Sequence, residues 1–160
     1  MSKRSTVHAT FVIEREYPAS RERVFAAWAD PDAKARWWGP SSGHSSGGHE
    51  LDFRVGGSEH LAVVTGEGVR YTFDSRYHDI VEGERIIYSY DMHRDGAPIS
   101  ASVATVELHP AGEGTKLVLT EQGAFLDDLD EPAAREHGTR ELLERLESEL
   151  AGDARAGLAR

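Results

Sequence analysis

The amino-acid sequence predicts an α+β fold in which a curved, seven-stranded antiparallel sheet packs against a long C-terminal helix. Three observations predict it: runs with alternating apolar residues between short turns, two short helical segments after the first run, and a long amphipathic segment near the end. A chain of 160 residues fits one domain. We expect this domain to cover residues 1–151 and residues 152–160 to form a frayed tail.

The first strand and the two short helices are bounded by clear stop and start residues. A strand is expected over residues 6–17, and Pro18 ends it because proline cannot donate to a strand ladder. Ser20 is a candidate N-cap for a short helix. Asp30, followed by a proline, favours a second helix that ends near residues 37–40.

The middle of the chain predicts the remaining sheet. Hairpin-length turns separate its strands, so the sheet should be antiparallel, and one of its faces is apolar. A loop over residues 41–48 precedes it, and a linker over residues 123–130 follows. The six strands are expected at residues 51–55, 59–65, 69–76, 86–92, 102–108 and 115–122.

The closing segment predicts a helix from Pro132 to about Leu150. Leu142, Leu143 and Leu146 lie on one face of it together with Leu150. An isolated amphipathic helix is marginal in water, so this one must dock on the apolar face of the sheet. A curved sheet leaves space beneath such a helix, which favours a small-molecule cavity.

Four motifs follow one another along most of the chain. They are Tyr17–Ser20 with Val24, Phe25 and Trp28; Asp30–Pro31 with Trp37–Pro40; Asp52–Gly57; and Gly114–Leu117 with Glu121–Gly123 and Glu136–Gly138. Their order resembles the START-like or SRPBCC superfamily, whose fold is the helix grip. Within it, the chain is similar to the subgroup named after the activator of the heat-shock protein 90 ATPase. That subgroup often has tryptophan after the last His-Gly, where this chain has Thr139, so we expect a different cavity shape.

The resemblance implies three functions, because members of the superfamily bind apolar ligands, cyclise polyketides or assist the chaperone, and fold alone does not decide between them. The leading hypothesis is binding of a small apolar or aromatic ligand between the C-terminal helix and the sheet, without catalysis. A second is a co-chaperone-like activator of the heat-shock protein 90 ATPase, with an acidic surface that contacts a basic partner. A third is a polyketide cyclase- or hydratase-like acid–base enzyme using Glu121, a tyrosine or His137.

Aromatic side chains dominate the candidate ligand-binding residues. Strand parity places Tyr71 with Phe73, and Tyr88 with Tyr90, on shared faces, and buried phenols need hydrogen-bond partners. A plain packed core is the alternative interpretation. The candidates are Trp28, Trp37, Trp38, Phe53, Tyr71, Phe73, Tyr88, Tyr90, Glu121, Phe125 and His137, with Trp37 and Trp38 expected near the mouth of the cavity.

Glu121 is the most informative polar candidate. If Leu117 and Leu119 face inward, strand parity turns Glu121 inward too, where an unpaired carboxylate is costly. It would then pair with His137 or Arg140, or anchor a ligand, and burial would raise its pKa. For His137 the alternatives are a position on the helix surface and one at the cavity edge.

The Asp52–Gly57 motif is interpreted as structural. Asp52 and Arg54 are expected to form a surface pair on the outer face of the sheet, worth under about 1 kcal/mol. The two glycines indicate a turn or bulge that needs positive φ.

Composition excludes several other classes. The net charge is −10, with 11 acidic and 10 basic residues in the first half and 17 and 8 in the second, so neither nucleic acid nor an anionic membrane is an expected partner. There is no cysteine, hence no disulfide, and the eight histidines lack metal-ligand spacing. We expect no metal, no cofactor, no signal peptide and no membrane span, and a cytoplasmic location. A homodimer is possible through an exposed edge strand or through the segment of the two short helices.

Overall fold

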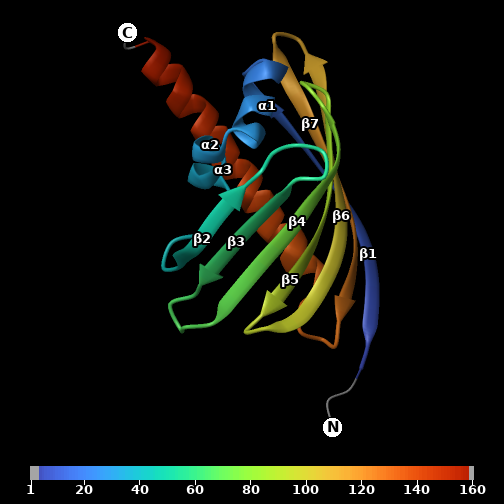
Figure 1. Ribbon diagram of the computed structural model, residues 1–160. Helices are drawn as coiled ribbons and strands as arrows, with labels where there is room; N and C mark the ends of the chain where they lie inside the picture. Colours follow the sequence, from blue (N-terminus) through green and yellow to red (C-terminus); the bar gives the residue numbers. More distant parts are fainter. Residues whose placement is uncertain (1–3, 159–160) are drawn as a thin grey trace.

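The computed structural model describes residues 4–158, with side chains for residues 4–152. Figure 1 shows a curved sheet with the last helix running diagonally across one face and the two short helices beside one end. The elements are β1 (Thr6–Tyr17), α1 (Arg21–Ala29), α2 (Pro31–Trp37), β2 (Ser45–Leu51), β3 (Ser58–Val64), β4 (Arg70–Val81), β5 (Arg85–Arg94), β6 (Ala97–Ala111), β7 (Gly114–Leu126) and α3 (Pro132–Leu158).

The seven strands form a single antiparallel sheet in the order β1-β7-β6-β5-β4-β3-β2. Only the β1–β7 pairing joins strands that are distant in sequence, and the other pairs are neighbours along the chain. This arrangement confirms the predicted helix-grip α+β fold.

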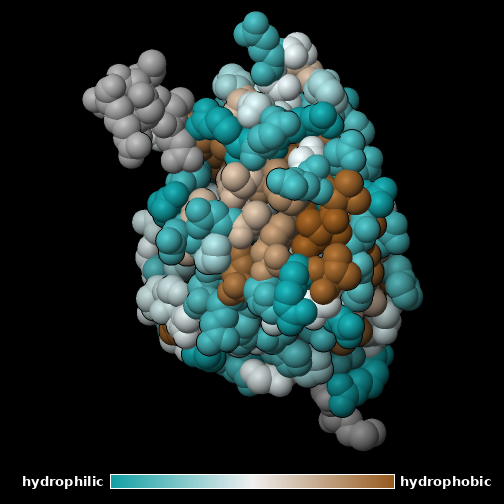
Figure 2. All heavy atoms as spheres, turned by 45° about the horizontal axis from the view of Figure 1, so that its top comes forward, coloured by the Kyte–Doolittle hydropathy of each residue, from teal (hydrophilic) through white to brown (hydrophobic). Residues whose placement is uncertain are grey.

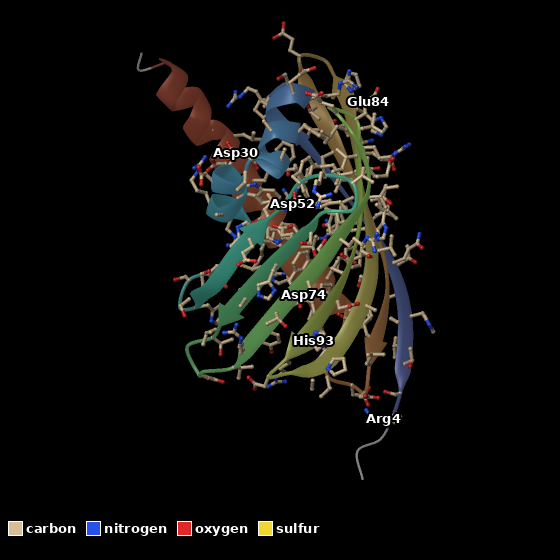
Figure 3. The ribbon with its side chains drawn as sticks, viewed as in Figure 1. Arg4, Asp30, Asp52, Asp74, Glu84 and His93 are labelled. Carbon is tan, nitrogen blue, oxygen red and sulfur yellow. The ribbon has the colours of Figure 1, made fainter. Side chains whose placement is uncertain are left out.

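Side-chain caps fix the two short helices where the sequence predicts them. The Ser20 hydroxyl accepts the backbone N–H of Arg23 at 3.2 Å and begins α1. The Asp30 carboxylate accepts the N–H groups of Asp32 at 2.9 Å and Ala33 at 3.4 Å and begins α2. Figure 3 shows Asp30 between the two helices. The caps let the chain turn sharply while satisfying otherwise unpaired donors.

Several predicted boundaries are wrong. β4 continues to Val81 and β6 covers Ala97–Ala111, both longer than expected, and three further elements also differ. β2 occupies Ser45–Leu51 and begins inside the loop expected over residues 41–48, because backbone pairing with β3 builds this exposed edge strand without an apolar face. β7 continues to Leu126, since β1 pairs with it as far as that residue. α3 extends to Leu158, so the part of the expected tail up to that residue is helical; residues 159–160 lie outside the described residues.

The Asp52–Gly57 motif forms a tight turn after β2 instead of a strand (Figure 3 labels Asp52). The expected pair is present, with Arg54 Nε 2.9 Å from Asp52 Oδ2, but it lies on this turn. Gly56 has φ of +83° and donates its N–H to the Tyr77 carbonyl at 2.8 Å. A Cβ on Gly57 would lie 2.2 Å from the Asp52 carbonyl oxygen. The glycines therefore serve the turn and its attachment to β4.

Replacing Gly57 with alanine should lower the free energy of unfolding by more than about 1 kcal/mol, because the added Cβ displaces the turn from β4. The control is Gly152→Ala on α3, where a Cβ meets open space and should add about 0.5–1 kcal/mol. Urea denaturation of both variants measures the two changes. Equal stability of G57A and the wild type would contradict the assignment.

The core lies between the inner face of the sheet and the three helices. It includes Ile13, Trp28, Ile86, Leu119 and Leu146, all with no exposed surface. Figure 2 shows a largely hydrophilic face on which hydrophobic residues gather near the centre. Within the described part of the chain, no helix combines the length and apolar character needed to cross a membrane.

Candidate ligand-binding site

A cavity of about 390 Å³ lies between α3 and the inner face of the sheet. Residues from strands β3 to β7 line one side, and residues of α3 between Ala134 and Arg145 line the other. Aromatic and aliphatic side chains provide most of its wall, chiefly Trp38, Leu61, Tyr71, Phe73, Tyr90 and Met92. The volume lies at the small end of the range for small-molecule sites.

The pleat of the strands explains which side chains reach the cavity. Tyr71 and Phe73 are two residues apart on β4 and both line it, as strand parity predicts. On β5, Tyr90 and Met92 line it in the same way, whereas Tyr88 is buried beside Trp28 and Trp38. Strand parity thus predicts correctly which face of the sheet each ring lies on. Whether a ring on that face reaches the cavity depends on how the core packs.

Five of the predicted candidates line the cavity: Trp38, Tyr71, Phe73, Tyr90 and Glu121.

Five others lie in the core or against it without lining the cavity: Trp28, Trp37, Phe53, Tyr88 and Phe125.

The position expected for Trp37 near the mouth is wrong. This side chain is fully buried, and its indole N–H donates to the Ala27 carbonyl at 2.9 Å. The next residue in the chain, Trp38, faces the cavity instead.

One wall of the cavity carries charged side chains that are almost completely buried. The Tyr90 hydroxyl donates to Glu121 Oε2 at 2.7 Å and accepts from Arg135 Nη1 at 2.9 Å. Arg135 Nη2 donates to Ser100 Oγ at 2.9 Å and to the Asp130 carboxylate. Arg135 Nη1 lies 3.8 Å from Glu121 Oε2, and the two side chains are only 9% and 3% exposed. We call Tyr90, Ser100, Glu121, Asp130 and Arg135 the Glu121 cluster.

Glu121 faces inward as strand parity predicts, but its helical partner differs from both expected residues. His137 is 76% exposed and lies 3.0 Å from Glu141, so its interpretation as a cavity-edge residue is wrong. Arg140 pairs with Glu136 on the outer surface of α3. The rotation of the docked helix turns Arg135 toward the sheet and carries positions 137 and 140 away from it. An acid–base mechanism therefore has no contribution from His137.

Burial sets the protonation behaviour of the Glu121 cluster. It raises the pKa of Glu121, and the hydrogen bond from Tyr90 and the charge of Arg135 oppose it only partly. Burial also raises the pKa of the Tyr90 phenol, as does the nearby carboxylate. Burial lowers the pKa of Arg135, but its neighbours Tyr90, Asp130 and Glu121 outweigh this and keep it above the ordinary value. Arg135 is a permanent cation.

Substituting Glu121 with glutamine should make the protein less sensitive to rising pH. Because the pKa of Glu121 is raised, the native protein holds this proton more tightly than the unfolded chain. The stability of the wild type relative to E121Q should fall as pH rises above about 4.3 and level off above the native pKa. Urea denaturation from pH 4 to pH 8 gives the difference, and a difference independent of pH would contradict the raised pKa.

A second buried charged cluster lies behind Trp38, and sequence reasoning missed it. Lys34 Nζ is 2.6 Å from Glu59 Oε1, and both side chains are at most 1% exposed. The Tyr77 hydroxyl bonds the same oxygen at 3.1 Å, and His49 Nε2 lies 2.7 Å from the other. Strand parity could have found Glu59, which shares a face with Leu61.

Aromatic rings surround the Lys34 ammonium. Its Nζ lies 4.4 Å from the Trp38 ring centre, 5.0 Å from Trp28 and 5.9 Å from Tyr88. Burial lowers the pKa of Lys34, while Glu59 opposes the shift. Burial would raise the pKa of Glu59, but the Lys34 charge and the hydrogen bonds from His49 and Lys34 leave it below its ordinary value. Cation–π contacts and the ion pair therefore hold Trp38 in the cavity wall.

Breaking the buried ion pair from one side should be strongly destabilising. Lys34→Met leaves Glu59 without its cation and should cost about 3–5 kcal/mol. Adding Glu59→Gln removes the stranded charge. Its amide oxygen can still accept from Tyr77, and its amide NH2 can donate to an unprotonated Nε2 of His49, so the double variant should recover most of the loss. A double-mutant cycle by chemical denaturation measures the coupling. Additive losses would show that the two residues do not act as a pair.

The described residues contain no group of three or more histidine, aspartate or glutamate side chains that could hold a metal ion.

The curved sheet, the diagonal helix and the cavity between them define a START-like protein of the helix-grip class.

The family within this class follows from comparison with known proteins. A family model described as "Activator of Hsp90 ATPase homolog 1-like protein" matches residues 18–151, and the chain belongs to this family. No curated protein matches the sequence.

Several solved structures are similar to this chain in both sequence and fold. A protein from Rhizobium loti is 47% identical, with a TM-score of 0.84 over 91% of this chain and 99% of its own. One from Rhizobium leguminosarum is 42% identical, with a TM-score of 0.89 over 93% and 98%. One from Chromobacterium violaceum is 30% identical, with a TM-score of 0.75 over 88% and 96%.

Proposed function

We propose that this protein binds a small molecule with an apolar or aromatic body in the cavity between α3 and the sheet. The observation that carries the proposal is the lining itself, which combines a mostly apolar wall with one buried charged wall. Ligand sites typically join a large apolar contact area to a few polar groups that fix orientation.

The position of the polar groups supports binding over simple core packing. A core holds charged side chains only when they are paired, as Lys34 and Glu59 are. Glu121 and Arg135 are paired too, but they also line a cavity that holds several water-sized volumes. Both side chains line the cavity, although only 3% and 9% of their surface is exposed.

The test uses the three tryptophans as reporters. Only Trp38 lines the cavity, so 4-phenylbutanol should change the tryptophan fluorescence of the wild type with a saturable dependence on concentration. The Trp38→Phe variant should still bind by calorimetry while losing most of the fluorescence change. A wild type that shows neither heat nor fluorescence change with this probe would contradict the proposal.

A blocking variant supplies the matched control. Gly138 lines the cavity, and a Cβ placed there meets no atom within 4 Å, so Gly138→Leu should fill part of the cavity and weaken binding about tenfold or more. Ala133→Leu places the same side chain on the exposed part of α3 and should leave affinity unchanged. Equal weakening by the two variants would show that the probe binds elsewhere.

The family description supports a second candidate, activation of the Hsp90 ATPase. The acidic side chains of α3 would then form the contact with a basic partner surface, although Glu136 and Glu144 already pair with Arg140 and Arg15 on this protein. ATP hydrolysis by purified Hsp90 decides the matter: saturable stimulation by this protein supports the candidate, and an unchanged rate removes it.

A further inference from the structure

We propose that the ligand of this cavity carries a protonated amine, or an equally strong cationic hydrogen-bond donor, which it places against Glu121. This inference rests on the proposed function and specifies the chemistry of the ligand. It follows from the balance of charge on the cavity wall and from the groups that are already paired there.

The charged wall has more acid than base. Glu121 and Asp130 face one guanidinium, that of Arg135, and all three residues line the cavity. The N-terminus of α3 adds partial positive charge, but Asp130 lies at that end and accepts the N–H of Glu131 at 2.9 Å. A ligand anion would therefore meet a cation that two carboxylates already neutralise.

Both cations of the lining are engaged with the protein. Arg135 donates to Tyr90, Ser100 and Asp130. Arg145, at the other end of the cavity, donates to the carbonyl oxygens of Gly39 at 2.8 Å and Pro40 at 3.1 Å. A ligand carboxylate that drew on either guanidinium would therefore compete with these contacts.

Glu121 has acceptor capacity that a ligand donor would use. A carboxylate offers roughly four acceptor positions, and the bond from Tyr90 takes one of them. Folding has already removed Glu121 from water, as its raised pKa reflects, so a bound cation adds only its own desolvation cost. The pairing would then be stronger than at an exposed carboxylate, because the site is nearly dry.

The aromatic lining favours the same head group. Tyr71, Phe73 and Tyr90 line the cavity, and Tyr90 is hydrogen-bonded to the carboxylate. The faces of such rings attract cations. The neighbouring Lys34 shows that this protein already holds an ammonium among aromatic rings beside a carboxylate.

The experiment varies only the head group. Calorimetry at pH 8 compares 4-phenylbutylamine, 4-phenylbutanol and 4-phenylbutyrate, which share one apolar body. The amine should bind about tenfold more tightly than the alcohol, and the carboxylate should bind most weakly. In the Glu121→Gln variant the amine should lose its advantage, while Glu113→Gln, in the exposed β6–β7 turn, should keep it.

The outcomes separate the two proposals. If the alcohol binds and the amine gains nothing over it, the cavity binds ligands but this inference is wrong. If the carboxylate binds best, Arg135 selects the head group and the inference is also wrong. If none of the three binds, the proposed function fails and this inference fails with it. The comparison of the three probes on the wild type stands even if E121Q does not fold.

Discussion

The ion pair between Lys34 and Glu59 joins two elements that lie apart in the sequence. Lys34 comes from α2 and Glu59 from β3, and both side chains are removed from water. Two buried charges tolerate little displacement, because separating them leaves each without compensation. The pair therefore anchors α2 on the sheet, together with the packing of Trp38 against Phe73 and Tyr88. Trp38, directly after α2, takes its place in the cavity wall from the same contact.

The cavity exists because the curved sheet and α3 meet only partly. In the middle of the helix the side chains of Leu143 and Leu146 are completely buried, whereas Gly138 and Thr139, about one turn earlier, line the cavity. At that point the wall changes from apolar rings to the Glu121 cluster. The result is a site with an apolar body and one charged end, which is the arrangement that orients an amphiphilic ligand.

Sequence reasoning found half of each charged cluster or less. Strand parity identified Glu121, because a period of two leaves only two faces to choose from. Its partner Arg135 depends on how α3 is rotated about its axis, and the sequence pattern fixes that rotation too loosely to separate residue 135 from residues 137 and 140. Glu59 had the same parity signal, but an acidic residue next to a turn is ordinarily exposed.

The sequence by itself determined the order of elements, the antiparallel sheet, the helix caps at Ser20 and Asp30 and the inward face of each central strand. These features depend on contacts between near neighbours in the chain and on the period of apolar residues, and short stretches of sequence contain both kinds of information. Only the tertiary structure decided that β2 is built from residues 45–51, that Trp38 and not Trp37 faces the cavity, and that Arg135 pairs with Glu121. Those outcomes depend on packing between distant segments, where a rotation of one residue along a helix replaces one side chain with another.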